Sequence, residues 1–311
     1  MSSDCSLFLY TEEEKAAVRK EFNLTEKHIN DGVDSILEWI SKQPHLVEAG
    51  ISRVGAESMI IISKGSIERA KEKIDNHYKY RALSPELIQT RELILHSPKK
   101  IWDNYSVVPL PNLLDNRRIF ICKFRENPTN LDNLDFYRRT LMILDLKLKY
   151  DYMLGDIWIV DFKHLGWAEL ISLNPMIYKK VSQLFTKGLN WRLYAIHVIN
   201  ISAPASIAQR VLDFFKQLVS ALILSRVVIH DTLEDLYKHV PKECLPEDYG
   251  GNAPHTDILT ENVENEMRKP ETTKYLLECS KLVSNEKLRP RDKNSNDEEF
   301  LSGSFKKLEF D

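Results

Sequence analysis

Residues 191–251 limit what this chain can fold into more than any other stretch. Residues 194–199 (YAIHVI) are a short run of aromatic, β-branched and aliphatic side chains, and the SAP at 202–204 interrupts it, which predicts a buried strand and a turn. Apolar residues then recur at helical spacing over residues 207–224, which predicts a long amphipathic helix. The run RVVIH at 226–230 predicts another strand.

The same alternation of strands and helices precedes this stretch. Residues 118–124 (RIFICKF) and 157–162 predict strands, and residues 134–150, 167–173 and 176–186 predict helices. Strands that alternate with helices are typical of a parallel sheet with helices on its faces. The sequence therefore predicts an α/β fold with a mostly parallel β-sheet covered by helices.

The amino-terminal part of the chain is helical in pattern. Residues 11–43 carry two helical patterns. Thr25 is placed to cap the second predicted helix, and Pro44 ends it. A third helix is expected over residues 66–82, with Ser66 as its cap. These three helices predict a small all-helical domain.

Turn signals and polar runs divide the rest of the chain. Pro98, Pro109 and Pro111, with neighbouring Asn and Asp, predict a linker. Residues 261–283 predict one or two helices, and the polar residues 285–296 are expected to be mobile. We therefore expect four regions: a helical amino-terminal domain over 11–96, a linker over 97–116, a sheet domain over 117–252, and a helical carboxy-terminal extension with a polar tail over 253–311.

Composition favours a cytoplasmic protein without a structural metal. The net charge of -3 shows no basic footprint for nucleic acid. Cys5, Cys122, Cys244 and Cys279 lie far apart, with no C-x-x-C pair, and predict reduced thiols. The first residues have no basic region before an apolar run, and no stretch approaches the ~20 apolar residues that span a bilayer.

Signatures of catalysis are missing from the sequence. It has no G-x-S-x-G elbow, no phosphate-binding or dinucleotide-binding glycine loop, and no H-E-x-x-H, so we expect no catalytic residues and no cofactor. Asp161 and His164, at the end of the predicted central strand, leave an acid–base enzyme as an alternative. A structural carboxylate that binds backbone donors is the favoured interpretation of Asp161, because the pair has no accompanying nucleophile.

Several blocks of residues, in order, resemble a known family. IHVIN at 196–200, the amphipathic helix, RVVIH, LEDLYKHVP at 233–241 and LPEDYGG at 245–251 together resemble the lipid-binding half of the CRAL-TRIO family, which includes the alpha-tocopherol and retinaldehyde carriers. Residues 68–87 are similar to the end of that family's helical domain, residues 155–175 to its central strand and following helix, and residues 303–311 to the tail of many arthropod members.

The resemblance implies a cytosolic carrier that holds one small hydrophobic molecule, such as a retinoid, carotenoid, tocopherol or other lipid. In the family, a mobile gate helix covers an apolar cavity and swings away at membranes. The residues that the resemblance places around the cavity are Trp158, Val160, Leu173, Val181, Leu184, Phe185, Leu189, Trp191, Leu193 and Ile196. Those that it places on the inner face of the gate are Ile207, Val211, Phe214, Phe215 and Leu218.

Some relatives also bind phosphoinositide headgroups beside the gate. The positions that correspond to their basic cluster read Ile61, Arg192, Tyr194, Leu222, Leu224 and Arg226. Only Arg192 and Arg226 keep a positive charge, so the resemblance implies weak, non-selective phosphoinositide binding, because each Lys or Arg near an anionic surface contributes roughly 1 kcal/mol. The apolar end of the gate at 222–224 is instead expected to enter a membrane.

A second function remains open. Trp158, Trp191 and Phe185 are large enough to fill the cavity, and the chain would then be a protein-interaction or membrane-sensing module with a degenerate pocket. The favoured carrier is expected to be a monomer that contacts membranes transiently and takes a small hydrophobic ligand.

Overall fold

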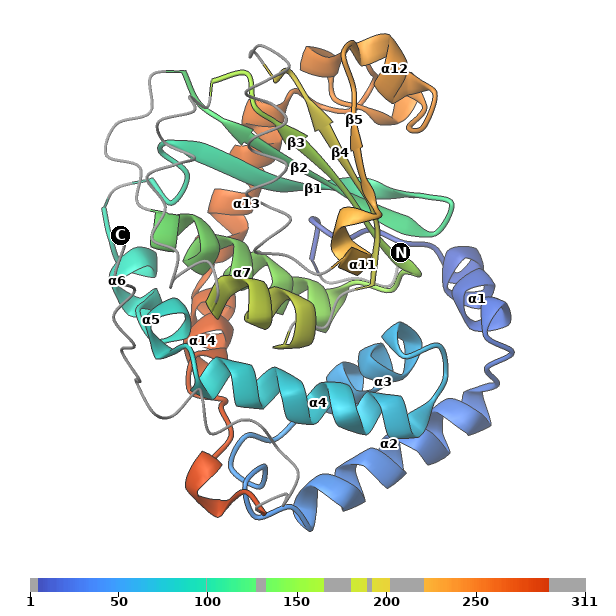
Figure 1. Cartoon of the computed structure of the whole chain (residues 1–311), viewed down its shortest axis with the longest axis vertical. Coiled ribbons are helices and arrows are strands. Elements are labelled where there is room, and N and C mark those ends of the chain that lie inside the picture. Colours follow the sequence, from blue (N-terminus) through green and yellow to red (C-terminus); the bar gives the residue numbers. More distant parts are fainter. Residues whose placement is uncertain are drawn as a thin grey trace, which may run out of the picture.

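The computed structural model describes residues 5–98, 100–126, 133–164, 180–188, 192–201 and 221–290. A twisted sheet occupies one end of the molecule and helices from the amino-terminal part occupy the other, with α7 (Asn133–Tyr150) between them (Figure 1). This is the α/β architecture that the alternating pattern predicts.

Four helices build the amino-terminal part: α1 (Glu12–Glu21), α2 (Glu26–Ser41), α3 (Arg53–Ile62) and α4 (Ile67–Ala82). Thr11, Thr25, Ser52 and Ser66 each accept a hydrogen bond from the backbone N–H three residues on, which satisfies a donor that the helix itself leaves free. The caps at Thr25 and Ser66 confirm the predicted helices. Helix α3 was not predicted, because its run of isoleucines has low intrinsic helix propensity, which burial in the core overrides.

The sheet has five strands in the order β1 (Tyr105–Leu114), β2 (Arg117–Phe124), β3 (Gly155–Asp161), β4 (Leu193–Ile199) and β5 (Val227–Ile229). β2 to β5 are parallel, and β1 pairs antiparallel with β2. The predicted mostly parallel sheet is confirmed, with β3 at its centre.

The prediction of a linker over 97–116 was wrong from residue 105 onward, where β1 begins. The residues that suggested a linker belong to a hairpin. Pro109 begins an irregularity in the pairing of this edge strand, where a missing N–H is tolerated. Asp115 and Asn116 have φ values of 47° and 58° in the two-residue turn to β2, a conformation that Asn and Asp adopt more readily than other residues with a side chain.

Further elements of the described chain include α5 (Pro85–Ile88), α6 (Arg91–Leu95), α12 (Leu233–Tyr237), η2 (Lys242–Cys244), η3 (Glu247–Tyr249), α13 (Thr256–Arg268) and α14 (Pro270–Cys279). α13 packs against β1, and its Leu259, Val263 and Met267 join the same apolar core as the strands. One or two helices were predicted over 261–283, and the structure has two, which are part of the main core.

The end of the described chain is anchored to the helical part. The N–H of Asn285 donates to the carbonyl of His45 at 2.9 Å, and Arg289 forms an ion pair with Asp75 at 2.6 Å beside η4 (Glu286–Leu288). The mobility expected for residues 285–296 is therefore wrong for residues 285–290, because Asp75 on α4 supplies a partner that the local sequence does not reveal.

A buried cluster of charges joins the two parts of the molecule. Asp145 on α7 accepts from Arg81 on α4 at 3.0 Å and from Arg91 on α6 at 2.6 Å, and all three side chains are buried. Arg81 also donates to the carbonyl of Cys279, and Arg91 to that of Leu276, at the end of α14. Burial alone would raise the pKa of Asp145, but the guanidinium groups outweigh it and lower that pKa to about 2.

We expect Asp145→Asn to lower the free energy of unfolding by about 3–5 kcal/mol, because two guanidinium groups would stay buried without a carboxylate. Urea denaturation measures the change. The matched control is Asp34→Asn, whose ion pair with Arg53 is solvent-exposed and whose loss should cost no more than about 0.5 kcal/mol. Equal losses in the two variants would contradict the role of the cluster.

Candidate functional site

Four of the predicted cavity residues lie on one face of the sheet. In parallel strands, side-by-side residues point to the same face, and the register pairs Trp158 with Ile196. An irregularity follows the pairing of Asp156 with Leu193, so that Tyr194 is an extra residue on β4. Because of this extra residue, Leu193 shares a face with Ile196, and Trp158 and Val160 stand beside them on β3.

Residues 180–188 contribute to the same hydrophobic core as these strands. Val181 and Leu184 are buried in the core cluster that contains Trp158 and Leu193, and Phe185 packs against its edge. The segment ends in η1 (Leu184–Gly188), which packs against α4. A Cβ on Gly188 would lie 2.6 Å from the Cβ of Tyr80, so only glycine allows this close approach.

A buried histidine fixes the same contact. His77 Nδ1 lies 3.0 Å from the carbonyl oxygen of Gly188, and burial first, then the charge of Arg81, lower the pKa of His77 to about 3. The ring is therefore neutral at pH 7, and its N–H donates to that carbonyl. The helical part thus positions η1 over the sheet.

Aromatic rings fill part of the space beside these residues. The ring of Trp158 stacks on Phe120 with centroids 4.8 Å apart and planes 12° apart, and Phe185 meets Tyr137 edge to face. The seven described candidates, Trp158, Val160, Val181, Leu184, Phe185, Leu193 and Ile196, all belong to this hydrophobic core or pack against it, and we refer to them together as the apolar wall. Leu173, Leu189, Trp191 and the five gate residues Ile207, Val211, Phe214, Phe215 and Leu218 lie outside the described residues.

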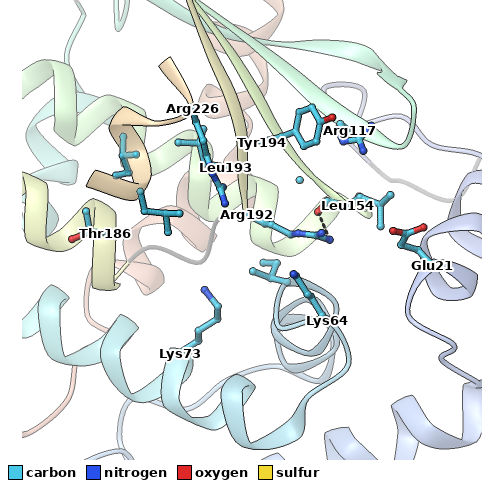
Figure 2. Close-up of a pocket in the computed structure, with 14 residues that line it drawn as sticks. Glu21, Lys64, Lys73, Arg117, Leu154, Thr186, Arg192, Leu193, Tyr194 and Arg226 are labelled. Atoms are coloured by element: carbon cyan, nitrogen blue, oxygen red, sulfur yellow. Dashed lines mark hydrogen bonds between the residues drawn. The ribbon is translucent and has the colours of Figure 1, made fainter. Parts of the chain in front are cut away.

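A basic pocket of about 560 Å³ opens at the amino-terminal ends of β3 and β4 (Figure 2). Lys64 and Lys73 enter it from the helical part, Arg192 from the sheet side, and Arg226 from the approach to β5. The remaining lining residues are Glu21, Ile62, Arg117, Leu154, Gly155, Thr186, Leu193, Tyr194, Leu222 and Ile223. The last two belong to α11 (Ala221–Leu224), at the end of the expected gate.

Positively charged side chains lie close together in the pocket. Burial lowers the pKa of Lys73. Burial also lowers the pKa of Arg192; Glu21 opposes that shift, and the charges of Arg117 and Arg226 add to it. Five cationic side chains and a single carboxylate line the pocket, so its charge favours an anionic ligand.

The predicted phosphoinositide positions account for only part of this charge. Arg192 and Arg226 line the pocket as expected, but Lys64, Lys73 and Arg117 were missed. Ile61 is buried on α3, and Lys64, just past the end of that helix with a φ of 57°, reaches the pocket instead. The pocket therefore carries five cations, of which the resemblance names two, and weak, non-selective phosphoinositide binding stays a prediction.

Asp161 has a structural role. Its Oδ2 accepts from the hydroxyl of Tyr249 at 2.8 Å, and its Oδ1 accepts from Asn200 and from the N–H of Lys163. No hydrogen bond to His164 is observed within the described residues, and no group of three or more metal-ligating side chains there is arranged to hold a metal ion. The carboxylate ties the end of β3 to β4 and η3, as the favoured interpretation predicts.

Comparison with known proteins identifies the sheet domain. The family model described as "CRAL/TRIO domain" matches residues 114–251. These residues belong to the CRAL-TRIO family. The match contains β2 to β5, the described apolar candidates and most of the pocket lining. Glu21, Ile62, Lys64 and Lys73 come from the amino-terminal helical part instead.

Relatives of the CRAL-TRIO domain carry the name alpha-tocopherol transfer protein-like. The protein of that name from Homo sapiens is 28% identical over 109 residues, which is 35% of this chain and 31% of the relative. The Mus musculus protein is 23% identical over 205 residues, 64% of this chain and 58% of the relative. These matches cover less than two thirds of each relative. The crystal structure of Sfh5 aligns with 80% of this chain and 92% of its own at 15% identity and a TM-score of 0.42.

Within the part of the chain that the structure describes, no helix combines the length and the apolar character that crossing a bilayer requires.

We expect Lys64→Gln and Lys73→Gln each to weaken the binding of a soluble inositol trisphosphate about fivefold, because each removes roughly 1 kcal/mol of attraction for the anion. Titration calorimetry at low salt measures the affinity. The control is Lys42→Gln, which replaces an exposed lysine that follows α2 and pairs with Glu38. Wild-type affinity in both pocket variants would exclude this pocket as the anion site.

Proposed function

We propose that this protein is a non-catalytic carrier that binds one small hydrophobic molecule against the apolar wall and exchanges it at membranes. The CRAL-TRIO match and the relatives named after tocopherol transfer support a lipophilic ligand. The observation that carries the proposal is the convergence of Trp158, Val160, Leu193 and Ile196 on one face of the sheet, beside Val181, Leu184 and Phe185.

Apolar burial would supply the binding energy. Each CH₂ group of a ligand buried against such a wall contributes about 0.8 kcal/mol, so a long hydrocarbon needs few polar contacts. The expected gate would complete the enclosure, and its last residues lead into α11, whose Leu222 and Ile223 line the basic pocket. Covering the ligand and binding an anion are therefore proposed to involve connected segments.

The basic pocket would bring the carrier to an anionic membrane. Leu222 is 64% exposed and Tyr194 is 57% exposed, and both line the pocket beside the cations. Exposed apolar side chains next to positive charges suit the surface of a bilayer, where charge attracts the headgroups and apolar groups enter the interface. A phosphoinositide headgroup is the proposed anion, and a monomer in the cytoplasm is the proposed state and location.

One observation favours the second candidate, an interaction module with a filled pocket. Trp158 is buried and stacks flat on Phe120, so this indole already occupies space beside the wall. If other side chains fill what remains, no ligand would enter. The two candidate functions predict different effects of a larger side chain at the apolar wall.

We expect wild-type protein exposed to a mixed lipid and retinoid extract to carry a stoichiometric adduct in native mass spectrometry. Val160→Trp should reduce that adduct roughly tenfold or more, because the added ring takes the room of several CH₂ groups. Its thermal stability should stay close to that of wild type, because a cavity accepts the ring without strain.

The control is Val47→Trp, the same change at a position that is 55% exposed on the helical part. A filled pocket predicts the opposite pattern. No adduct would form in wild type, and Val160→Trp would be destabilised by about 1–3 kcal/mol through overpacking. That result would replace the carrier with the interaction module.

A further inference from the structure

Three histidines meet on the face of the sheet opposite the apolar wall. His197 lies on β4, His230 directly follows β5, and His239 directly precedes the buried Val240 beyond α12. Their ring centroids are 5.1, 5.4 and 5.3 Å apart, so each ring touches both others. His197 and His230 are 4% and 5% exposed, and His239 is exposed.

The geometry of the cluster favours uncharged imidazole rings. His197 Nδ1 and His230 Nε2 are 2.9 Å apart, a hydrogen bond that needs one N–H and one bare nitrogen. A proton on each of these two rings would place two N–H groups face to face and break this bond. A proton on His239 would add a third positive charge in contact with both.

Few charges around the cluster can balance added protons. On α12, Asp235 favours a charged His230, but Asp235 already pairs with Lys238 at 2.6 Å. On β3, Asp161 shares the cluster's face of the sheet, and its carboxylate binds Asn200 and Tyr249 of η3. On the neighbouring strands, Ile159 and Val228 flank His197 and are apolar. The remaining charged residues of these segments are Asp156, which lies on the other face of β3 and pairs with Lys147, and the exposed Asp231 and Glu234.

The rings hold a weakly attached strand. β5 has three residues at the sheet edge, and two hydrogen bonds frame it, Ile196 N–H to the carbonyl of Arg226 and His230 N–H to that of Val198. α12 packs against β4 beside it. We propose that His197, His230 and His239 form an acid-sensitive latch that fastens β5 and α12 to β4 when the rings are neutral and releases them as pH falls below about 6.5.

The direction of the pH dependence follows from the burial of neutral rings. Burial first, then His230 and His239, lower the pKa of His197 to about 4 from its ordinary value near 6.5, and burial also lowers the pKa of His230. The opened state therefore binds more protons than the closed state between these values. Attachment is complete above pH 6.5 and weakens as pH falls toward 4.

Release of β5 would also change the lining of the basic pocket. Arg226, one residue before β5, lines that pocket, and so do Leu222 and Ile223 just upstream. An anionic membrane surface at roughly -30 mV lowers the local pH by about half a unit, so contact with such a surface would favour opening. This consequence rests on the proposed function, whereas the latch itself does not.

The test is hydrogen exchange of ligand-free, full-length protein at pH 7.5 and 5.5, corrected for the intrinsic effect of pH on exchange. This range lies above the titration of ordinary carboxylates. For the peptide over residues 226–240, we expect the opening equilibrium to rise about tenfold at pH 5.5, as a shift of the His197 pKa from 6.5 to about 4 requires. The centre of the sheet, in β2 and β3, should not change.

Three variants complete the design. His197→Gln should reduce the tenfold ratio to roughly threefold or less, since it removes the ring whose pKa shift sets that ratio. His239→Gln changes an exposed ring, so it should fold and should give a smaller ratio than wild type. The control His96→Gln replaces an exposed histidine at the end of α6 and should keep the wild-type ratio.

The latch is overturned if wild-type exchange over residues 226–240 is independent of pH, or if all three variants keep the wild-type ratio. Either outcome would leave the carrier proposal standing, because the measurement uses no ligand. A missing lipid adduct would conversely leave the latch standing.

Discussion

The contact of Asp145 with Arg81 and Arg91 is the interaction on which the arrangement of this molecule depends. α4, α6, α7 and the end of α14 come from distant parts of the chain, and each supplies a charge or a carbonyl to one buried point. Such a cluster adds little net stability, because desolvation offsets the attraction. Any packing that separates its members leaves a charge buried alone, so the cluster selects one docking of the helices against the sheet.

That docking creates both parts of the candidate site. α4 carries Arg81 into the charge cluster, His77 to the carbonyl of Gly188, and Lys73 into the basic pocket. A shift of α4 would therefore move η1 over the apolar wall and change the spacing of the cations together. The amino-terminal helices are part of the site, although the CRAL-TRIO match begins only at residue 114.

Local sequence patterns predicted most of the helices and strands. The elements that they did not predict depend on tertiary packing. YAIHVI and RVVIH predict β4 and β5 because burial requires apolar, β-branched runs there, and Ser66 marks the start of α4 because a helix needs a cap. β1 was mistaken for a linker because its prolines lie at a sheet edge, which a local pattern cannot distinguish from a loop.

The site was predictable only where resemblance supplied positions. The apolar candidates alternate correctly along β3, but the placement of Leu193 beside Ile196 requires the extra residue at Tyr194, which is visible only in the pairing of the strands. Lys64, Lys73 and Arg117 come from three separate elements, and no spacing in the sequence links them. A charge missing at Ile61 is replaced three residues later, so comparing single positions underestimates a pocket built from several segments.

Both ends of β5 carry groups of interest. Arg226 precedes this strand and lines the basic pocket at its amino-terminal end, whereas His230 follows it and contacts His197 at its carboxy-terminal end. A three-residue edge strand makes few hydrogen bonds, so side chains at its ends carry a large share of its attachment. A proton or an anion that alters either end therefore acts on the same short element, which makes β5 the place where the state of the pocket and the state of the histidines become linked.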